Sequence, residues 1–200
     1  MDCVKYLGVH ITKDLSWDHH TSHIASKATN TLNFLRRNIR VSNSKIKTQA
    51  YKSLVRPQME YAQVVWDPIY EDHANKLEAV QRRAARFALG RYRQRSCVGE
   101  MLTSLEWPHL TQRRHDARLA MFYKIHYGLV ASPMPLILKG HKEPTRTENT
   151  LAYHIPFAGQ NYYRDSFFLR TARVWNGLPE STVRAETLTA FKSSLPPFPQ

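Results

Sequence analysis

The order of apolar and polar positions predicts one β-strand followed by a series of helices. Residues 4–11 are rich in β-branched and aromatic side chains, which is typical of a strand, and residues 12–15 suit a turn. Ser16 is a good residue to cap a helix, and Asp18 would lie in its first turn. A helix over 17–39 is predicted because apolar residues recur at helical spacing, at Ile24, Ala28, Leu32, Leu35 and Ile39.

A second helix is predicted to begin at Asn43 or Ser44 and to continue to Asp67-Pro68. The apolar residues expected on its inner side are Ile46, Ala50, Leu54, Tyr61 and Val65. Pro57 lies within this pattern, and proline removes a helical hydrogen bond and clashes with the preceding turn. We therefore expect a kink or break near Arg56.

Three more helices are predicted before residue 130. One covers about 72–91, with an inner stripe of Leu77, Val80, Ala84 and Phe87. A short one covers 96–105. A longer one runs from Pro108 to about Tyr127 and ends before Gly128; its inward residues are expected to be Ala117, Ala120, Met121 and Ile125.

The pattern changes after residue 130. Residues 131–160 contain four prolines and little periodicity, which predicts a linker or a loosely ordered segment. Residues 161–178 are aromatic and basic and are expected to be extended before a short helix, and 182–195 suit one more amphipathic helix. We thus expect a mainly α fold: a helical bundle over 16–130 preceded by one β-strand in 1–15, with 161–200 as a partly ordered C-terminal tail.

Composition adds a strong positive charge. Lys and Arg number 29 against 16 Asp and Glu, which gives a net charge of +13, and such an excess attracts polyanions such as nucleic acid. The hydrophobic content of 42% excludes a wholly disordered chain. Two cysteines 94 residues apart form neither a disulfide framework nor a zinc site, so an intracellular protein is expected. No apolar run is long enough to cross a membrane, and the start shows no secretory signal.

The sequence offers no clear catalytic group. Nucleotidyl transfer by two metal ions needs paired carboxylates, and Asp14, Asp18, Asp67 and Asp72 are instead scattered through turns and helix ends. His19 and His23 lie one helical turn apart and could share a metal, but the glutamate of the zinc-helix motif and a third ligand are missing. We therefore expect no catalytic residue, no metal site and no cofactor, and a polar helix start at these histidines.

The clearest candidate surface is the basic helix near 72–95. From residue 76 onward it holds seven cations against Glu78 alone. At helical spacing Arg82, Arg86 and Arg93 fall on one face, opposite the apolar stripe. A ridge of cations can follow a phosphate backbone, whereas a mixed-sign surface would indicate simple solvation. The predicted nucleic-acid-binding residues are Lys76, Arg82, Arg83, Arg86, Arg93, Arg113 and Arg114. Most aromatic residues suit the core; Tyr92, Tyr162 and Tyr163 are the exceptions expected outside it.

Four sequence stretches, in order, resemble one family. The run Arg56-Pro57-Gln58-Met59-Glu60-Tyr61 through Trp66-Asp67-Pro68, followed by Leu77-Glu78-Ala79-Val80-Gln81-Arg82-Arg83-Ala84-Ala85-Arg86, resembles the segment after the polymerase palm in reverse transcriptases of non-LTR (LINE-like, jockey-type) retrotransposons. Tyr6-Leu7-Gly8-Val9 with Leu15-Ser16-Trp17 resembles their last palm strand and turn. Leu102 to Trp107 with Arg113-Arg114, and Ser166 to Pro179 with Phe191-Lys192, resemble later parts of the same elements.

The resemblance implies a fragment of an RNA-directed DNA polymerase that comprises the end of the palm (1–15), the thumb (16–130) and a tail. The thumb of such an enzyme holds the template–primer duplex, and its primer grip would correspond here to Leu7 and Gly8. The catalytic palm aspartates, which hold Mg²⁺ in the parent enzyme, have no counterpart here, so the chain is not expected to be an enzyme on its own.

The expected partners are an RNA/DNA or DNA duplex, bound without sequence preference, and a palm and fingers of a parent polymerase; no membrane partner is expected. Three alternatives remain open: a helical module that binds another protein or is a non-functional remnant, a metalloprotein that uses His19 and His23, and a chain unstable alone because its first strand lacks a partner.

Overall fold

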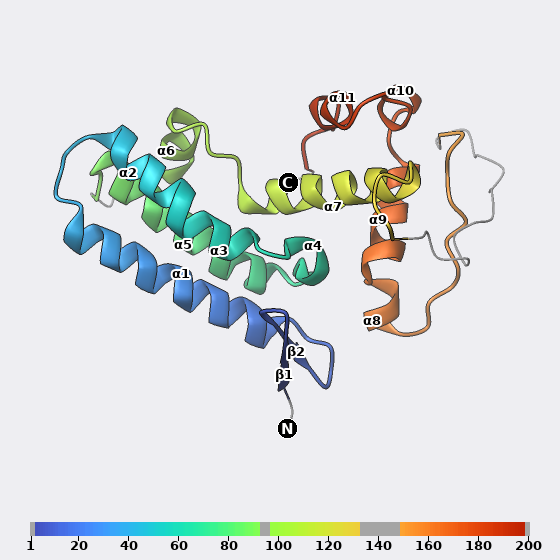
Figure 1. Ribbon diagram of the computed structural model, residues 1–200, viewed down its shortest axis with the longest axis horizontal. Helices are drawn as coiled ribbons and strands as arrows, with labels where there is room; N and C mark the ends of the chain where they lie inside the picture. Colours follow the sequence, from blue (N-terminus) through green and yellow to red (C-terminus); the bar gives the residue numbers. More distant parts are fainter. Residues whose placement is uncertain (1–2, 93–96, 133–148, 199–200) are drawn as a thin grey trace. The chain divides into compact units, whose positions relative to one another are not determined.

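The computed structural model describes residues 3–92, 97–132 and 149–198. Within these ranges the fold is mainly α-helical and has a two-stranded sheet near the N-terminus, which confirms the predicted class (Figure 1). The chain forms two compact units, Met1–Arg113 and Arg114–Gln200. The division therefore falls within the last long helix rather than after residue 130, where the sequence pattern placed it.

The first strand has a partner within the first unit. Strands β1 (Cys3–Tyr6) and β2 (Val9–Thr12) pair antiparallel, with Tyr6 opposite Val9. The two residues between them, Leu7 and Gly8, both have positive φ, of 45° and 85°. A two-residue turn with both φ values positive matches the right-handed twist of a hairpin. The single strand predicted over 4–11 is therefore a hairpin, and β1 is not left unpaired.

Helices α1 (Asp18–Asn38) and α5 (Glu71–Leu89) lie side by side and run in the same direction. The Lys76 ammonium near the start of α5 contacts Asp18 at the start of α1, and Arg83 farther along α5 contacts Thr29. The predicted apolar stripes are confirmed within both helices, whose inner residues are buried, and each helix begins and ends within about two residues of its predicted bounds. Ile39, the last residue of the predicted first stripe, lies just past the end of α1 and is partly buried.

A broken helical segment runs between α1 and α5. It consists of α2 (Ser44–Ala50), a π-helical turn η1 (Tyr51–Val55), α3 (Arg56–Glu60) and α4 (Gln63–Trp66). In the π-helical turn the Arg56 N–H bonds to the Tyr51 carbonyl, five residues back. A wide turn of this kind relieves the conflict that Pro57 would create in an α-helix, so the irregularity lies where the proline predicts it.

The buried side of this segment is not the predicted one. Tyr51, Val55, Met59 and Trp66 are buried, whereas Ile46, Leu54, Tyr61 and Val65 are each at least 49% exposed. Both sets recur at roughly helical spacing, so the periodicity alone did not distinguish them. The predicted inner stripe is therefore wrong at these four exposed positions, whereas its remaining member, Ala50, is partly buried against the core.

Two further helices follow α5. Helix α6 (Val98–Ser104) contributes Met101 and Leu102 to the core of the first unit, and α7 (Leu110–His126) begins in that core with Leu110. Gly128 has a φ of +65°, and the Leu129 N–H bonds to the Lys124 carbonyl, so the glycine ends α7 as predicted. Ala120 and Ile125 are buried as predicted, and Ala117 and Met121 are partly buried.

The second unit is helical and has its own core. Helix α8 (Asn161–Arg164) lies where an extended segment was predicted, and α9 (Phe167–Asn176) is the short helix predicted after it. Helices α10 (Glu180–Val183) and α11 (Leu188–Ser193) replace the single helix predicted over 182–195. Its largest core residues are Phe122, Tyr123, Trp175 and Phe191.

Residues 149–160 belong to this unit and do not behave as a linker. Asn149 is buried, and its amide donates to the carbonyls of Trp175, Asn176 and Leu178 at 2.7, 3.3 and 3.2 Å. Asn176 and Tyr153 exchange two bonds of 2.9 Å. These contacts satisfy the carbonyls at the end of α9. The rest of the predicted linker, 133–148, lies outside the described residues.

Candidate nucleic-acid interface

Beyond its acidic first turn, the solvent side of α5 carries cations and no exposed carboxylate. Arg83 is exposed and Arg82 and Arg86 are half-buried, while Leu77, Ala84 and Ala88 on the opposite side are buried. At about 100° per residue the three arginines occupy one contiguous arc of the helix. The structure thus places Arg82, Arg83 and Arg86 together, and we call these three residues the α5 ridge.

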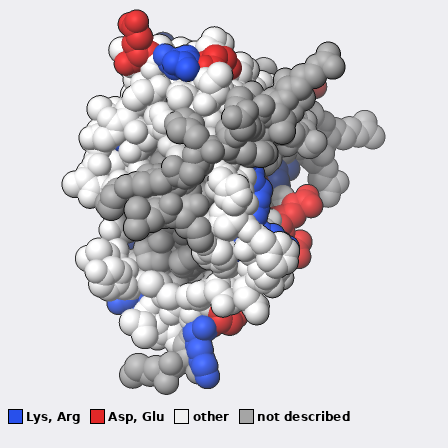
Figure 2. Space-filling model, turned by 90° about the vertical axis from the view of Figure 1, so that its right-hand side faces the viewer, with Lys and Arg blue, Asp and Glu red and all other residues white. Residues whose placement is uncertain are grey.

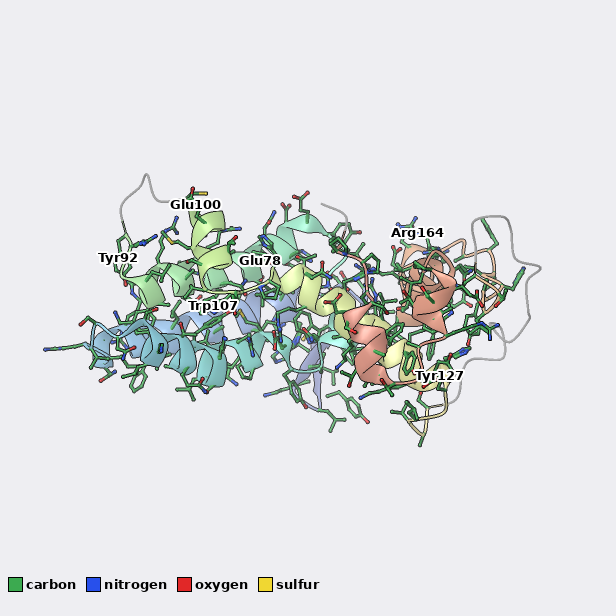
Figure 3. The ribbon with its side chains drawn as sticks, turned by 90° about the horizontal axis from the view of Figure 1, so that it is seen from above. Glu78, Tyr92, Glu100, Trp107, Tyr127 and Arg164 are labelled. Carbon is green, nitrogen blue, oxygen red and sulfur yellow. The ribbon has the colours of Figure 1, made fainter. Side chains whose placement is uncertain are left out.

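Three carboxylates of the first unit are engaged by residues other than Arg82, Arg83 and Arg86. Glu78 is only 5% exposed and accepts bonds from the backbone N–H and the hydroxyl of Thr111 at 2.9 and 3.2 Å. Figure 3 labels Glu78 on α5. Glu60 pairs with Arg113, and the Lys76 ammonium beside Asp18 lowers the pKa of that carboxyl. The α5 ridge therefore forms no ion pair with a carboxylate among the described residues.

A groove of about 460 Å³ runs between α1 and α5 beside the ridge. Its charged lining residues are Lys76 and Arg83, and its other polar residues are Ser22, Ser26, Thr29 and Asn30 of α1. Arg83 is held in place because its Nη2 donates to the Thr29 hydroxyl at 3.0 Å and its Nε to the Ala79 carbonyl at 3.2 Å. Hydroxyl, amide and guanidinium groups are the usual donors to phosphate oxygens.

Lys76 is less available than the ridge arginines. Its ammonium donates to Asp18 Oδ1 at 2.6 Å and to the Ser22 hydroxyl at 2.9 Å. Asp18 also lies 3.1 Å from His73. Asp18 therefore partly balances the charge of Lys76. Lys76 should attract an anion less strongly than the arginines of the ridge.

The other predicted contact residues do not join the ridge. Arg113 forms a two-pronged ion pair with Glu60, its Nη2 lying 3.2 Å from Oε2. Arg114 is 1% exposed and the neighbouring Arg118 is 3% exposed. Arg93 lies outside the described residues. Of the seven predicted residues, three form the ridge and Lys76 lines the adjoining groove.

Leu7 and Gly8 lie at the tip of the hairpin, where Leu7 is 74% exposed. The Tyr61 hydroxyl donates to the Leu7 carbonyl at 3.0 Å, and the Tyr61 carbonyl accepts from the Trp66 indole at 2.8 Å. A Cβ at Gly8 would lie 3.3 Å from Tyr61 Cε1. The break between α3 and α4 thus fixes the hairpin tip while leaving the Leu7 side chain in solvent.

Four histidines gather where the hairpin meets α1. The His10 ring lies 5.1, 5.8 and 4.5 Å from the rings of His19, His20 and His23, measured between centroids. His20 is buried, and its Nδ1 accepts from the His10 N–H at 3.2 Å. Sequence spacing pointed to His19 and His23 only, because His10 joins them through the hairpin rather than through helical periodicity.

The cluster disfavours protonation. Burial lowers the pKa of His20 to about 4, and the charges of His10, His23 and His19 add to this effect. Burial and the charge of His23 also lower the pKa of His10. No group of three or more His, Cys, Asp or Glu side chains suited to hold a metal ion occurs in the described part of the chain.

A second basic surface, which sequence periodicity did not single out as a site, lies where α1 and α5 end beside α2. A groove of about 450 Å³ is lined there by Asn33, Arg36, Arg37, Ile39, Lys47, Phe87 and Tyr92. Figure 3 labels Tyr92 just beyond α5. Three cations from two helices meet two aromatic rings in this groove.

In the second unit, Arg164, Arg173 and Arg170 gather around Asp165, and they lower the pKa of its carboxyl. Arg164 pairs with Asp165 at 2.8 Å and Arg184 pairs with Glu180. The Thr150 hydroxyl and Arg184 lower the pKa of Glu180 to about 2. On the face in Figure 2, the described Lys and Arg side chains are scattered among uncharged ones.

Comparisons with known proteins returned no match: no family model fits the chain, and no curated protein or solved structure is significantly similar to it. Among the described residues, no helix has the length and apolar character needed to span a membrane.

Proposed function

We propose that the first unit binds an RNA/DNA or DNA duplex without sequence preference, by contacts to the phosphate backbone. The observation that carries this proposal is the α5 ridge: three arginines on one arc outside the core, none of which forms an ion pair with a carboxylate among the described residues, while Glu78 and Glu60 are engaged by other groups. Binding of a duplex to such a surface is favourable because its cations neutralise phosphates and so release counterions condensed on the nucleic acid.

The groove beside the ridge supports the same proposal. Arg83 lines the groove and also belongs to the ridge, so a strand that follows the ridge would pass the hydroxyl and amide groups of α1. These groups contact backbone and sugar rather than base edges, which is the pattern of binding that ignores sequence.

The resemblance to the thumb of non-LTR retrotransposon reverse transcriptases gives this binding a context. We propose that the chain derives from that region and holds a template–primer duplex for a palm and fingers supplied by a parent polymerase. It would not transfer nucleotides itself, because its sequence lacks an aromatic-x-Asp-Asp pair. Leu7 and Gly8 would then lie near the primer end.

The direct test is binding of the purified chain to a blunt RNA/DNA hybrid over a salt series, with two unrelated sequences. We expect similar affinity for both sequences and a steep loss of affinity as salt rises. The double variant Arg82→Ala/Arg86→Ala should bind both more weakly. The matched control is Lys13→Ala/Lys192→Ala, which removes the same charge at two exposed residues that do not belong to the ridge.

Two results would contradict the proposal. One is a folded chain that does not bind the hybrid, and the other is binding that does not change with salt. An equal loss of affinity in the ridge variant and the control would show that net charge acts without the ridge.

A second candidate function is a helical module that binds another protein. It is favoured by four apolar side chains that the segment over 44–66 leaves exposed, Ile46, Leu54, Tyr61 and Val65. Exposed apolar patches on helices often mark interaction sites. The variant Leu54→Asp should abolish any partner binding and leave hybrid binding unchanged, which separates this candidate from the first.

A further inference from the structure

The groove at the ends of α1 and α5 has an unusual charge environment. Residues 19–59 contain eight Lys and Arg and no Asp or Glu. Three of these cations, Arg36, Arg37 and Lys47, line the groove together. None of the three pairs with a carboxylate among the described residues, so the chain itself leaves their charge uncompensated there.

Aromatic rings hold two of these cations in position. The Arg36 guanidinium carbon lies 5.5 Å from the centre of the Tyr92 ring, and the Lys47 ammonium lies 5.3 Å from the centre of the Phe87 ring. Cation–π contacts of this kind are attractive without neutralising the charge. The cations are therefore ordered and remain able to bind an anion.

Helix ends alone do not account for this arrangement. Arg36 and Arg37 lie in the last turn of α1, and Lys47 in the last turn of α2, where cations offset the partial negative charge of the helix end. That effect acts on each helix separately. It does not require cations of two helices to share one groove with an exposed aromatic ring.

The two aromatic rings differ in accessibility. Phe87 is 2% exposed and belongs to the core, whereas Tyr92 is 54% exposed. An exposed aromatic face beside cations suits an unpaired base, because a base within a duplex already has both faces stacked on its neighbours. The Asn33 side chain on the groove wall adds a hydrogen-bonding group.

We propose that this groove binds an unpaired nucleotide of a nucleic-acid strand, with its phosphate on Arg37 and Lys47 and its base stacked on Tyr92. The inference builds on the proposed duplex binding and assigns the groove to a single-stranded extension of that duplex. It differs from the α5 ridge in residues and in the form of nucleic acid that it recognises.

The test compares a blunt RNA/DNA hybrid with the same hybrid carrying a short single-stranded RNA extension, with a free single strand as a third probe. The wild-type chain should bind the extended hybrid more tightly than the blunt one. Tyr92→Ala should weaken binding of the extended hybrid by about fivefold to a hundredfold, the usual effect of removing one stacking side chain, and should leave the blunt hybrid unaffected.

Two controls match these variants. Tyr162→Ala removes another exposed tyrosine, from the second unit, and should change neither affinity. Arg37→Ala/Lys47→Ala should remove the preference for the extended hybrid, whereas Lys13→Ala/Lys192→Ala, with the same change in charge, should keep it. Circular dichroism on each variant establishes that it is folded.

The inference fails if the extension adds no affinity, or if Tyr92→Ala and the double groove variant lose no more than their controls. Failure of the proposed duplex binding is recognised separately. In that case the blunt hybrid does not bind, while binding of the free single strand that depends on Tyr92 would still support the groove.

Discussion

The Tyr51 hydroxyl donates a hydrogen bond of 3.0 Å to Gln81 Oε1 inside the first unit. Gln81 in turn donates to the Pro108 carbonyl at 2.9 Å, and the Tyr51 ring stacks on Trp107 with 4.3 Å between centroids. Burial raises the pKa of the Tyr51 hydroxyl, so it remains a donor. These side-chain contacts thus connect the π-helical turn, α5 and the segment that leads into α7.

Replacing this hydroxyl should destabilise the chain. In Tyr51→Phe the Gln81 oxygen keeps its burial and loses its donor, which costs about 1–3 kcal/mol of the free energy of unfolding. Urea denaturation measures this loss. Tyr162→Phe, at an exposed tyrosine, should cost almost nothing, and equal effects of the two variants would show that the buried bond contributes no stability.

Acid should destabilise the hairpin end of the first unit. Because the folded pKa of His20 is about 4 against 6.5 for a free histidine, the unfolded chain takes up a proton first as pH falls. The contribution of neutral His20 to the free energy of unfolding is complete above about pH 6.5 and is lost as pH falls from there toward 4. At 1.36 kcal/mol per pKa unit, the loss is at most about 3 kcal/mol. His10, whose pKa is also lowered, acts in the same direction.

Thermal unfolding between about pH 7 and pH 5 checks this prediction. The Tm of the wild-type chain should fall over that range, and the Tm of His20→Gln should start lower but fall less. His154→Gln, at an exposed histidine, should follow the wild-type slope. A fall in Tm as steep in His20→Gln as in the wild type would rule out His20 as its source.

The α5 ridge should be visible in the salt dependence of binding. Each lost phosphate contact lowers the slope of log affinity against log salt by about 0.9 for a B-form duplex. Arg82→Ala/Arg86→Ala should therefore reduce the slope by nearly 2, equally for different sequences. An unchanged slope with weaker affinity would mean that the arginines act through packing rather than through phosphate contacts.

The hairpin turn carries strain that substitution should relieve. Leu7 has a φ of 45°, where a branched side chain costs about 1 kcal/mol, and its side chain is exposed. Leu7→Asn creates the Asn-Gly pair preferred in such turns and should raise the free energy of unfolding by up to about 1 kcal/mol. Gly8→Ala should lower it, because its φ is 85° and its Cβ would approach Tyr61.

Denaturation curves of both turn variants test this. A destabilised Leu7→Asn would show that the leucine makes a stabilising contact in the folded chain. A stabilised variant that binds the primer end less well would instead indicate that the strained leucine is kept for function.

The sequence predicted the parts of the fold that depend on local periodicity. The stripes of α1 and α5 and the end of α7 at Gly128 follow from spacing and from one glycine. The segment over 44–66 contains two apolar sets at helical spacing, and only packing against α1 and α5 decides which is buried. Residues 149–160 show little periodicity because their order comes from contacts of Asn149 with a helix end distant in sequence.

The candidate sites likewise divide into one that local spacing predicts and one that depends on packing between helices. Arg82 and Arg86 share one helix, so spacing alone grouped them on the side opposite the buried stripe, and the structure adds Arg83 beside them. The groove of Arg36, Lys47 and Tyr92 draws on three separate segments, and its assembly depends on how the helices pack. Charge counting over residues 19–59 was the available signal for it.

The π-helical turn lets the segment over 44–60 hold one residue more than an α-helix with the same buried face needs. Tyr51 and Met59 flank most of this turn and are both buried. With one residue fewer between them they would lie about 700° apart in a regular α-helix, which is close to two full turns, so the same face would be kept. Deleting one residue from 52–55 should therefore close the turn to an α-helical one with Tyr51 and Met59 still facing the core, and related chains that fold in this way should tolerate a single-residue deletion here better than in α1 or α5.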